Sequence, residues 1–196
     1  MSCFIKRSTA APHRLRVNRR GFIKFGVLAT VAAAFKPAGA IAAVSHSLNS
    51  KKNLSIFNTH TGEHLDVCYC QDGVYRSGAL NKIKHILRDH RTGDIKAIDT
   101  RVLDILYTLS RRLDTPGPFH IISGYRSPAT NAALHRKSKR VATHSFHTQG
   151  MAIDFRVPDC KTNTVHTAAV TLRAGGVGYY PESDFVHVDC GPVRYW

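Results

Sequence analysis

Apolar and polar residues alternate along two neighbouring segments, residues 54–58 and 63–69. Alternation with a period of two is typical of a strand that buries one face. The four residues between them, Thr59-His60-Thr61-Gly62, are polar and end in glycine, which suits a turn. The pattern therefore predicts a β-hairpin.

Elsewhere the apolar residues recur every three or four positions, which is the spacing of one helix face. Ser127 and Pro128 are typical of an N-cap and a first helical position, so they predict the start of a short helix. On these grounds we expect helices over residues 79–90, 129–137 and 162–174. A further helix is expected to end near residue 109, with Asp99 or Thr100 as its cap.

Short apolar segments between these helices are expected to be strands, and they cover residues 119–122, 150–157, 177–180 and 185–189. The order of elements predicts an α+β fold with a mostly antiparallel sheet and flanking helices. No internal repeat is visible, and the length suits one hydrophobic core. We therefore expect a single domain over residues 43–196.

Residues 1–42 contain eight basic residues and no acidic residue. A basic start, an apolar stretch and small residues around Ala40 are the parts of a secretory signal. Arg19-Arg20 followed by Phe-Ile-Lys resembles a twin-arginine signal, which exports folded proteins. We predict a twin-arginine signal peptide cleaved near Ala40 or Ala42, and a periplasmic mature domain. A basic nucleic-acid-binding arm and a short membrane anchor are the alternatives.

The net charge of +15 falls to +7 when residues 1–42 are removed, because 20 Lys+Arg then face 13 Asp+Glu. The charge therefore gives little support to nucleic-acid binding, and it could equally favour an anionic polymer such as a cell wall. No apolar run reaches the ~18–20 residues of a spanning helix. We expect no nucleic-acid partner and no stable membrane insertion after cleavage.

The cysteines of the mature domain are Cys68, Cys70, Cys160 and Cys190. An exported protein meets an oxidising compartment, where disulfides persist. A bridge between Cys68 and Cys70 would be strained. A Cys160–Cys190 disulfide and buried free thiols are both compatible with the sequence.

The candidate chemistry lies in three residues. His147 and Asp154 are seven residues apart, and His187 lies in the last long predicted strand. Two imidazole nitrogens and one carboxylate oxygen suit a catalytic zinc site, because three protein ligands leave a fourth position open. The chain has 12 His, so spacing alone also fits a loop histidine and a salt-bridged carboxylate. However, Asp154 lies between Ile153 and Phe155, and a buried carboxylate needs a partner.

The pattern Ser-x-His-x-x-Gly-x-Ala-x-Asp over residues 145–154, followed by His187, resembles the signature of the zinc D-Ala-D-Ala peptidases. That group shares its fold and metal site with lysostaphin-type peptidases and the hedgehog domain. Residues 122–127 resemble the group's substrate-binding Ser-Gly-Tyr-Arg segment. Residues 88–91, 172–180 and 186–192 resemble its twin-arginine-exported murein endopeptidase K branch. The resemblance implies a hedgehog/D,D-peptidase-like zinc fold, with one Zn²⁺ held by His147, Asp154 and His187.

The resemblance also assigns the segment that contains Ser123, Tyr125 and Arg126 to substrate binding. Arg126 would bind a substrate carboxylate or help to hold the developing oxyanion, since a guanidinium is planar, charged and able to form paired hydrogen bonds. For Arg126 alone, a surface ion pair would be the simpler interpretation.

Two carboxylates are candidates for the general base. Many relatives of the group carry Glu three residues before the last zinc histidine, and here that residue is Asp184, which is one methylene shorter. Asp189 lies two residues after His187 and would share its face of a strand. Asp189 could be the base or a carboxylate that orients a zinc ligand. We favour Asp189 over Asp184 as the base on geometry.

With a zinc site of this kind, the resemblance implies a zinc-dependent peptidoglycan endopeptidase that cuts cross-links between stem peptides during wall growth. Its resemblance to murein endopeptidase K implies diaminopimelate–diaminopimelate (L,D) cross-links as substrates. One alternative is a D,D-carboxypeptidase or D,D-endopeptidase that acts on D-Ala bonds. Another is a non-catalytic, zinc-containing peptidoglycan-binding module. The expected partners are peptidoglycan stem peptides and the twin-arginine export machinery.

Overall fold

The computed structural model describes residues 50–115, 117–138 and 141–196. The predicted signal peptide, residues 1–42, lies outside this part of the chain, and so does the expected start of the domain at residue 43. In the described part, no helix has the length and apolar character needed to cross a membrane.

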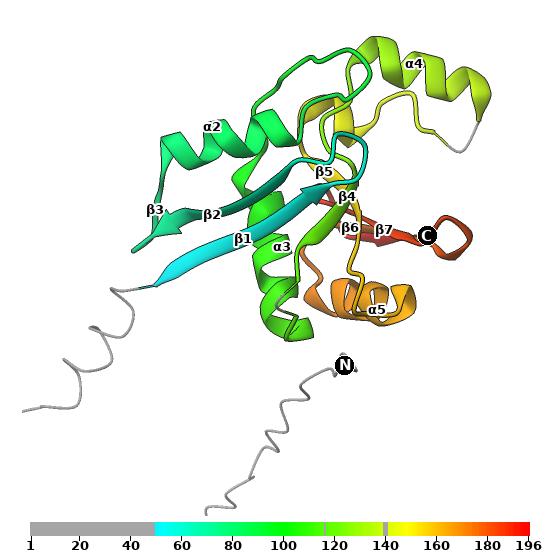
Figure 1. Ribbon diagram of the computed structural model, residues 1–196. Helices are drawn as coiled ribbons and strands as arrows, with labels where there is room; N and C mark the ends of the chain where they lie inside the picture. The colour runs from blue at the N-terminus through cyan, green and yellow to red at the C-terminus, as the bar shows by residue number, and fades with distance from the viewer. Residues whose placement is uncertain (1–49, 116, 139–140) are drawn as a thin grey trace, which may run out of the picture.

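A single eight-stranded sheet runs through the molecule in the order β3-β2-β1-β4-β5-β7-β6-β8 (Figure 1). Its strands are β1 Lys51–Asn58, β2 His64–Gln71, β3 Val74–Tyr75, β4 Phe119–Ser123, β5 Ala152–Arg156, β6 Gly176–Tyr180, β7 Phe185–Asp189 and β8 Arg194–Tyr195. The predicted hairpin is confirmed as the antiparallel pair β1–β2. The sheet is mixed, because β1 pairs with β4 and β6 with β8 in parallel. The α+β class is confirmed.

The helices of the described residues are α2 Ser77–Ile86, α3 Thr100–Leu113, α4 Pro128–Lys137 and α5 Thr162–Leu172, with short 3₁₀ turns η1 Phe146–Gln149 and η2 Pro181–Ser183. Asp99 caps α3 by accepting from the backbone N–H of Arg101. Ser127 caps α4 by accepting from the N–H of Thr130. Figure 1 shows α4 projecting from the body on the opposite side from α3 and α5.

Helix α2 ends four residues before the expected His90. The carbonyl of Leu87, just after the helix, accepts a hydrogen bond from the N–H of Tyr125 at 2.8 Å. A Cβ on Gly124 would lie 2.5 Å from the same carbonyl oxygen. The chain therefore leaves the helix where the segment after β4 packs against it, and this contact positions the residues that follow β4.

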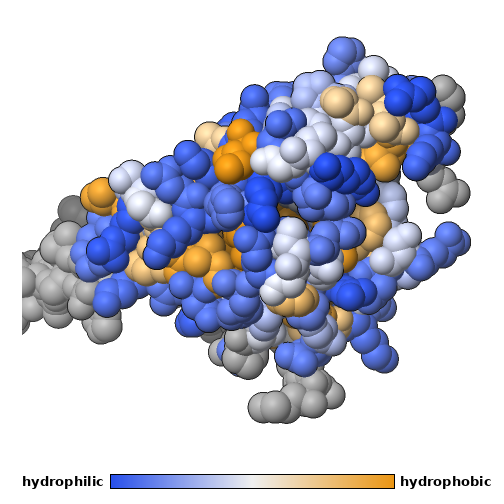
Figure 2. Space-filling view, turned by 45° about the horizontal axis from the view of Figure 1, so that its top comes forward, coloured by the Kyte–Doolittle hydropathy of each residue, from blue (hydrophilic) through white to orange (hydrophobic). Residues whose placement is uncertain are grey.

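The two faces of the strands around β5 and β7 differ in character. Helix α5 contacts β6 and β7, and the ring of Tyr179 on β6 stacks on His166 of α5 at 4.7 Å. Because side chains alternate along a strand, Phe155 and Val186 share this apolar face, whereas Asp154 and His187 lie on the other. The face seen in Figure 2 is mostly hydrophilic, with smaller hydrophobic areas between.

A disulfide between Cys160 and Cys190 does not form, because Cys190 carries a free thiol. Cys160 follows the end of β5, whereas Cys190 lies beside the residue that precedes β5 and donates its Sγ–H to the carbonyl of Met151. The antiparallel pairing of β5 with β7 thus places the two cysteines at opposite ends of β5. Cys68 and Cys70 are free thiols too.

Candidate metal centre

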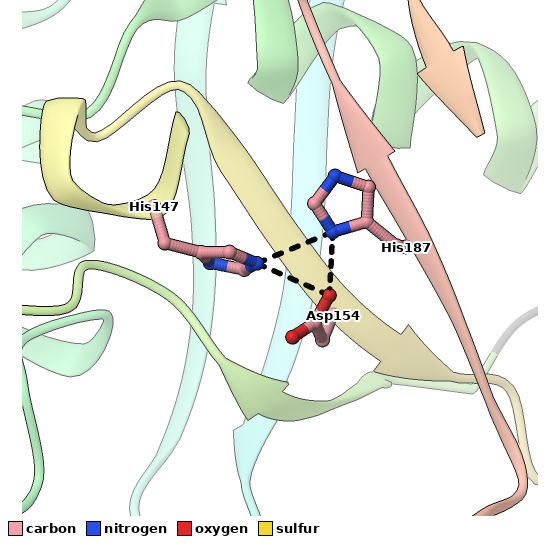
Figure 3. A group of neighbouring side chains, drawn as sticks. All are labelled: His147, Asp154 and His187. Carbon is pink, nitrogen blue, oxygen red and sulfur yellow. Dashed lines mark hydrogen bonds and ion pairs between the residues drawn. The ribbon is translucent and has the colours of Figure 1, made fainter. Parts of the chain in front are cut away.

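Three side chains converge on the face of β5 and β7 that lies opposite α5 (Figure 3). His147 comes from η1, Asp154 from β5 and His187 from β7. Asp154 and His187 are directly paired across the β5–β7 ladder, so their side chains share one face. Asp154 Oδ1 lies 2.7 Å from His187 Nδ1 and 3.2 Å from His147 Nε2, and the two nitrogens are 3.2 Å apart.

The turn between His147 and Asp154 requires glycine. Gly150 closes η1 with φ +71°, a left-handed conformation that most residues avoid. A Cβ there would also collide with the backbone carbonyl of Ala97. The N–H of Gly150 bonds to the carbonyl of His147, which fixes the histidine relative to the strand that carries Asp154.

The outer nitrogen of each imidazole has a partner that can only accept a proton. His147 Nδ1 lies 2.8 Å from the carbonyl oxygen of Gly124, and His187 Nε2 lies 3.0 Å from Asp189 Oδ2. In the neutral rings these outer nitrogens carry the protons, so His147 Nε2 and His187 Nδ1 present lone pairs. Two lone pairs and a carboxylate oxygen then face one another.

This arrangement fits a metal ion. The three ligand atoms lie within 4.8 Å of one another, and all three residues are buried. Tetrahedral zinc with bonds of about 2.0–2.1 Å holds its ligand atoms roughly 3.3 Å apart. The separations of 2.7 to 3.2 Å are close to that value. A cation among the three atoms would also relieve the repulsion between their lone pairs.

Burial and mutual contact set the ionisation of the group in the absence of a metal. Burial lowers the pKa of His147 below its ordinary value. Burial opposes the charge on Asp154, but the adjacent histidines outweigh it and hold its pKa below the usual range. Burial also disfavours the charged form of His187, yet hydrogen bonds to Asp154 and Asp189 raise its pKa to about 9. The carboxylate charge that attracts this proton would equally attract a cation.

Asp189 is enclosed by hydrogen-bond donors, and its side chain is fully buried. Its Oδ1 accepts from the N–H groups of Gly176 and Gly191 and from Arg194 Nη1. Its Oδ2 accepts from Arg194 Nη2 at 2.7 Å and from His187 Nε2. These contacts hold the pKa of Asp189 below its ordinary value despite burial, and both of its oxygens are already engaged.

Asp184, the other candidate base, lies at the turn between η2 and β7. Its side chain is 60% exposed, it accepts a hydrogen bond from Thr162, and it lies 3.6 Å from Arg156 Nη1. It lines a shallow hollow beside Thr162 instead of the cavity in front of the three converging residues.

Arg126 lies beside the three converging residues, and 11% of its side chain is exposed. Its Nη2 is 3.5 Å from Asp154 Oδ2 and 3.3 Å from Ser123 Oγ, and its Nη1 is 3.4 Å from Asn131 Oδ1. Ser123 thus contacts Arg126, whereas the ring of Tyr125 lies under Lys96, outside the cavity lining. Arg126 Nε is buried without a partner among the described residues.

Asp89 holds the segment that carries Arg126. Its carboxylate accepts from the N–H groups of Ser127 at 2.8 Å and Arg91 at 2.9 Å. The N–H of Arg126 bonds to the carbonyl of His147 at 3.2 Å. Arg126 is therefore clamped between the loop after α2 and the turn that bears His147.

A cavity of about 620 Å³ opens in front of the group. Arg126, His147, Asp154 and His187 line it, together with residues that the sequence did not single out for a role there. Those residues include Tyr180, Arg194 and Trp196, and His144 also lies on the wall. Tyr180 lies on β6 two residues after Gly178, and Gly178 is paired with His187. The sequence predicted both strands but not this pairing, which is what places Tyr180 on the face of His187.

A peptidase family model described as Peptidoglycan L,D-endopeptidase MepK matches residues 46–196. Peptidoglycan L,D-endopeptidase MepK of Escherichia coli (strain K12) is 41% identical over 179 residues, which cover 91% of this chain and 97% of that protein. The probable peptidoglycan L,D-endopeptidase MepK of Haemophilus influenzae is 36% identical over 180 residues, covering 91% and 95%.

The matched region contains every residue of the converging group, the arginine beside it and the strands that carry them. The identity extends over most of the chain, well beyond the short motif around His147. The chain therefore belongs to the family of peptidoglycan L,D-endopeptidase MepK, and it is a peptidase.

Proposed function

We propose that the protein is a zinc-dependent peptidoglycan endopeptidase that hydrolyses the L,D cross-link between two diaminopimelate residues. The observation that carries the metal dependence is the convergence of His147 Nε2, Asp154 Oδ1 and His187 Nδ1, with the outer nitrogen of each ring already bonded. The choice of bond rests on the relatives, which are named peptidoglycan L,D-endopeptidases. The placement of these two histidines and one aspartate on the sheet also supports a hedgehog/D,D-peptidase-like fold.

In this proposal His147, Asp154 and His187 hold one Zn²⁺. The ion would act as a Lewis acid on the scissile carbonyl and would make the attacking water more acidic. Asp189 acts as the carboxylate that orients His187, a role that its enclosed oxygens favour over that of general base.

Arg126 binds the substrate. Its guanidinium lines the cavity, the Nε of that group has no partner among the described residues, and the neighbouring Asp154 balances only part of its charge. A carboxylate of a stem peptide would form charge-assisted hydrogen bonds with this group. Diaminopimelate carries such a carboxylate next to the cross-link, so Arg126 would position the amide in front of the three converging residues.

The location follows from the substrate. Peptidoglycan lies outside the cytoplasmic membrane, so we propose a periplasmic enzyme. The twin arginines at positions 19 and 20 support export by the twin-arginine machinery, with cleavage near Ala40 or Ala42.

The decisive test is digestion of purified, defined muropeptide dimers by the mature domain, with and without a chelator. The panel contains diaminopimelate–diaminopimelate dimers and D-Ala–diaminopimelate dimers, and mass spectrometry reads the products. Chelator-sensitive cleavage of the first dimer alone is the expected result. Cleavage of the second dimer alone would favour a D,D-endopeptidase. No cleavage by a folded, zinc-loaded protein would favour a binding module.

A further inference from the structure

The segment after β7 adds the edge strand β8 beside β6 and brings Trp196 to the cavity. Arg194–Tyr195 forms β8, which pairs with β6 in parallel. The backbone N–H of Trp196 bonds to the carbonyl of Val177, and its carbonyl accepts from the N–H of Tyr179. Backbone pairing therefore fixes the position of the Trp196 side chain at the cavity wall.

Gly178 provides the space for the indole. A Cβ at this position would lie 2.8 Å from the indole atoms of Trp196, closer than real Cβ contacts come. Gly178 is paired with His187, so the indole occupies the place beside this histidine that a β6 side chain would take. The ring centroids of His187 and Trp196 are 5.3 Å apart.

The indole fixes the hydroxyl of Tyr180. Trp196 Nε1 donates to Tyr180 Oη at 2.8 Å, and an indole N–H can only donate. The proton of the Tyr180 hydroxyl must therefore point away from the indole. No described residue accepts it. The ring of Phe185 stacks on Tyr180 at 4.5 Å and restrains the phenol ring.

Tyr180 lies two residues after Gly178, so its side chain is on the same face as His187 and lines the cavity with Arg126. A hydroxyl held as a donor at the edge of a cavity resembles the donors that stabilise an oxygen as it gains negative charge. The only oxygen that gains such charge during amide hydrolysis is the carbonyl oxygen of the scissile bond. A substrate amide in the cavity would present this oxygen near the candidate metal centre.

We propose that Tyr180 is a further catalytic residue, whose hydroxyl donates a hydrogen bond to the scissile carbonyl oxygen, and that Trp196 is the residue that positions this hydroxyl. The proton stays on Tyr180 throughout, so no bond to the phenol oxygen is made or broken. The hydrogen bond strengthens as the carbonyl oxygen becomes negative, so it favours the transition state over the bound substrate. The inference rests on the proposed endopeptidase function but not on which cross-link is cut.

The test compares steady-state kinetics of the zinc-loaded mature protein with those of Tyr180→Phe, Trp196→Phe and the double variant. The substrate is whichever muropeptide dimer the wild type cleaves, so failure of the proposed function would appear first, in the wild type. Tyr179→Phe is the matched control, because it removes the same hydroxyl one residue away, from the opposite face of β6.

Tyr180→Phe is expected to lower kcat about 10²-fold with little change in KM, as loss of one oxyanion donor does. Trp196→Phe keeps a ring over Gly178 and is expected to lower kcat about tenfold, the effect of losing one positioning hydrogen bond. The double variant should match Tyr180→Phe, because the two residues act through one hydroxyl. Zinc content, measured by atomic emission, should equal that of the wild type.

Equal kcat for Tyr180→Phe and Tyr179→Phe would overturn the catalytic role. A raised KM at unchanged kcat would overturn it too, because it would mean that Tyr180 binds only the ground state. Multiplicative losses in the double variant would overturn the positioning role of Trp196. If Tyr180→Phe does not fold, unchanged kcat in Trp196→Phe overturns the proposal.

Discussion

His187 lies between two carboxylates, with Nδ1 2.7 Å from Asp154 Oδ1 and Nε2 3.0 Å from Asp189 Oδ2. The Asp154 carboxylate faces the candidate metal centre, whereas the Asp189 carboxylate is buried behind the imidazole ring of His187. Arg194 supplies two further hydrogen bonds to the Asp189 carboxylate, so its charge is balanced even without a metal. The imidazole is held in the orientation that a metal would need.

We expect Asp189→Asn to weaken zinc binding about 10- to 100-fold, because the amide keeps the shape of the group but loses the charge that orients His187. Competition with a chromogenic chelator measures this change. Asp184→Asn is the matched control, since that carboxylate is exposed and lines another hollow. Loss of turnover in Asp184→Asn with zinc still bound would identify Asp184 as the base and contradict our placement of it.

His147→Ala should abolish zinc binding and muropeptide cleavage together, because it removes one of three ligand atoms. His144→Ala is the control, since His144 lies on the cavity wall but is exposed and outside the converging group. Zinc content and cleavage are measured on the same preparations. Cleavage that survives in His147→Ala would refute the assignment of the metal site.

Arg126→Lys should lower kcat/KM, because an ammonium keeps the charge but lacks the planar fork that pairs with a carboxylate. A substrate whose diaminopimelate carboxylate is amidated tests this recognition. The wild type should prefer the free carboxylate, and Arg126→Ala should cleave both forms at similar rates. A preference that persists in Arg126→Ala would show that another residue reads the carboxylate.

Asp89→Asn should destabilise the protein at neutral pH by about 1–3 kcal/mol, because the buried side chain no longer accepts as a carboxylate from Ser127 and Arg91. Despite burial, hydrogen bonds from the Thr130 side chain and from the N–H groups of Ser127 and Arg91 hold the pKa of Asp89 below the value of 3.8 for a free carboxyl. Its stabilising effect is therefore present above pH 3.8 and lost as the pH falls towards the folded-state pKa.

Thermal unfolding of the wild type and Asp89→Asn at pH 7 and pH 3 measures this effect. The difference in Tm between the two proteins should shrink at pH 3. An equal difference at both pH values would mean that the charge of Asp89 does not contribute to stability.

Replacement of Arg19 and Arg20 together by lysine should retain the precursor in the cytoplasm. Cell fractionation and the size of the protein measure export and cleavage. Normal export of this double variant would show that the signal does not depend on paired arginines.

Much of the fold could be predicted where local signals are strong. Ser127, the cap of α4, was identified because a serine directly before proline at a helix start is a strong signal. For α3 the sequence left Asp99 and Thr100 open as the cap, and the structure selects Asp99. The parallel pairing of β1 with β4 and the two-residue strand β8 were not predicted. Both depend on backbone hydrogen bonds between segments far apart in the chain, which leave no periodicity in the sequence.

The candidate site divides in the same way. His147, Asp154 and His187 were identified because a motif fixes their spacing, and the structure brings them together. The surroundings of Asp189 were not predictable, because its donors come from residues 176, 191 and 194 as well as from His187. The disulfide considered between Cys160 and Cys190 was wrong, because strand direction decides which ends meet.

Asp154 and His187 occupy directly paired positions on two hydrogen-bonded strands, so their spacing follows from the pleat of the sheet itself. Loop motion cannot alter it. Much of the wall around them, by contrast, comes from the segments near His144 and Trp196, which lie outside those two strands. The residues of this outer wall, the rim of the cavity, can therefore change while Asp154 and His187 keep their positions. Relatives with different bond preferences could therefore arise by exchange of rim residues alone.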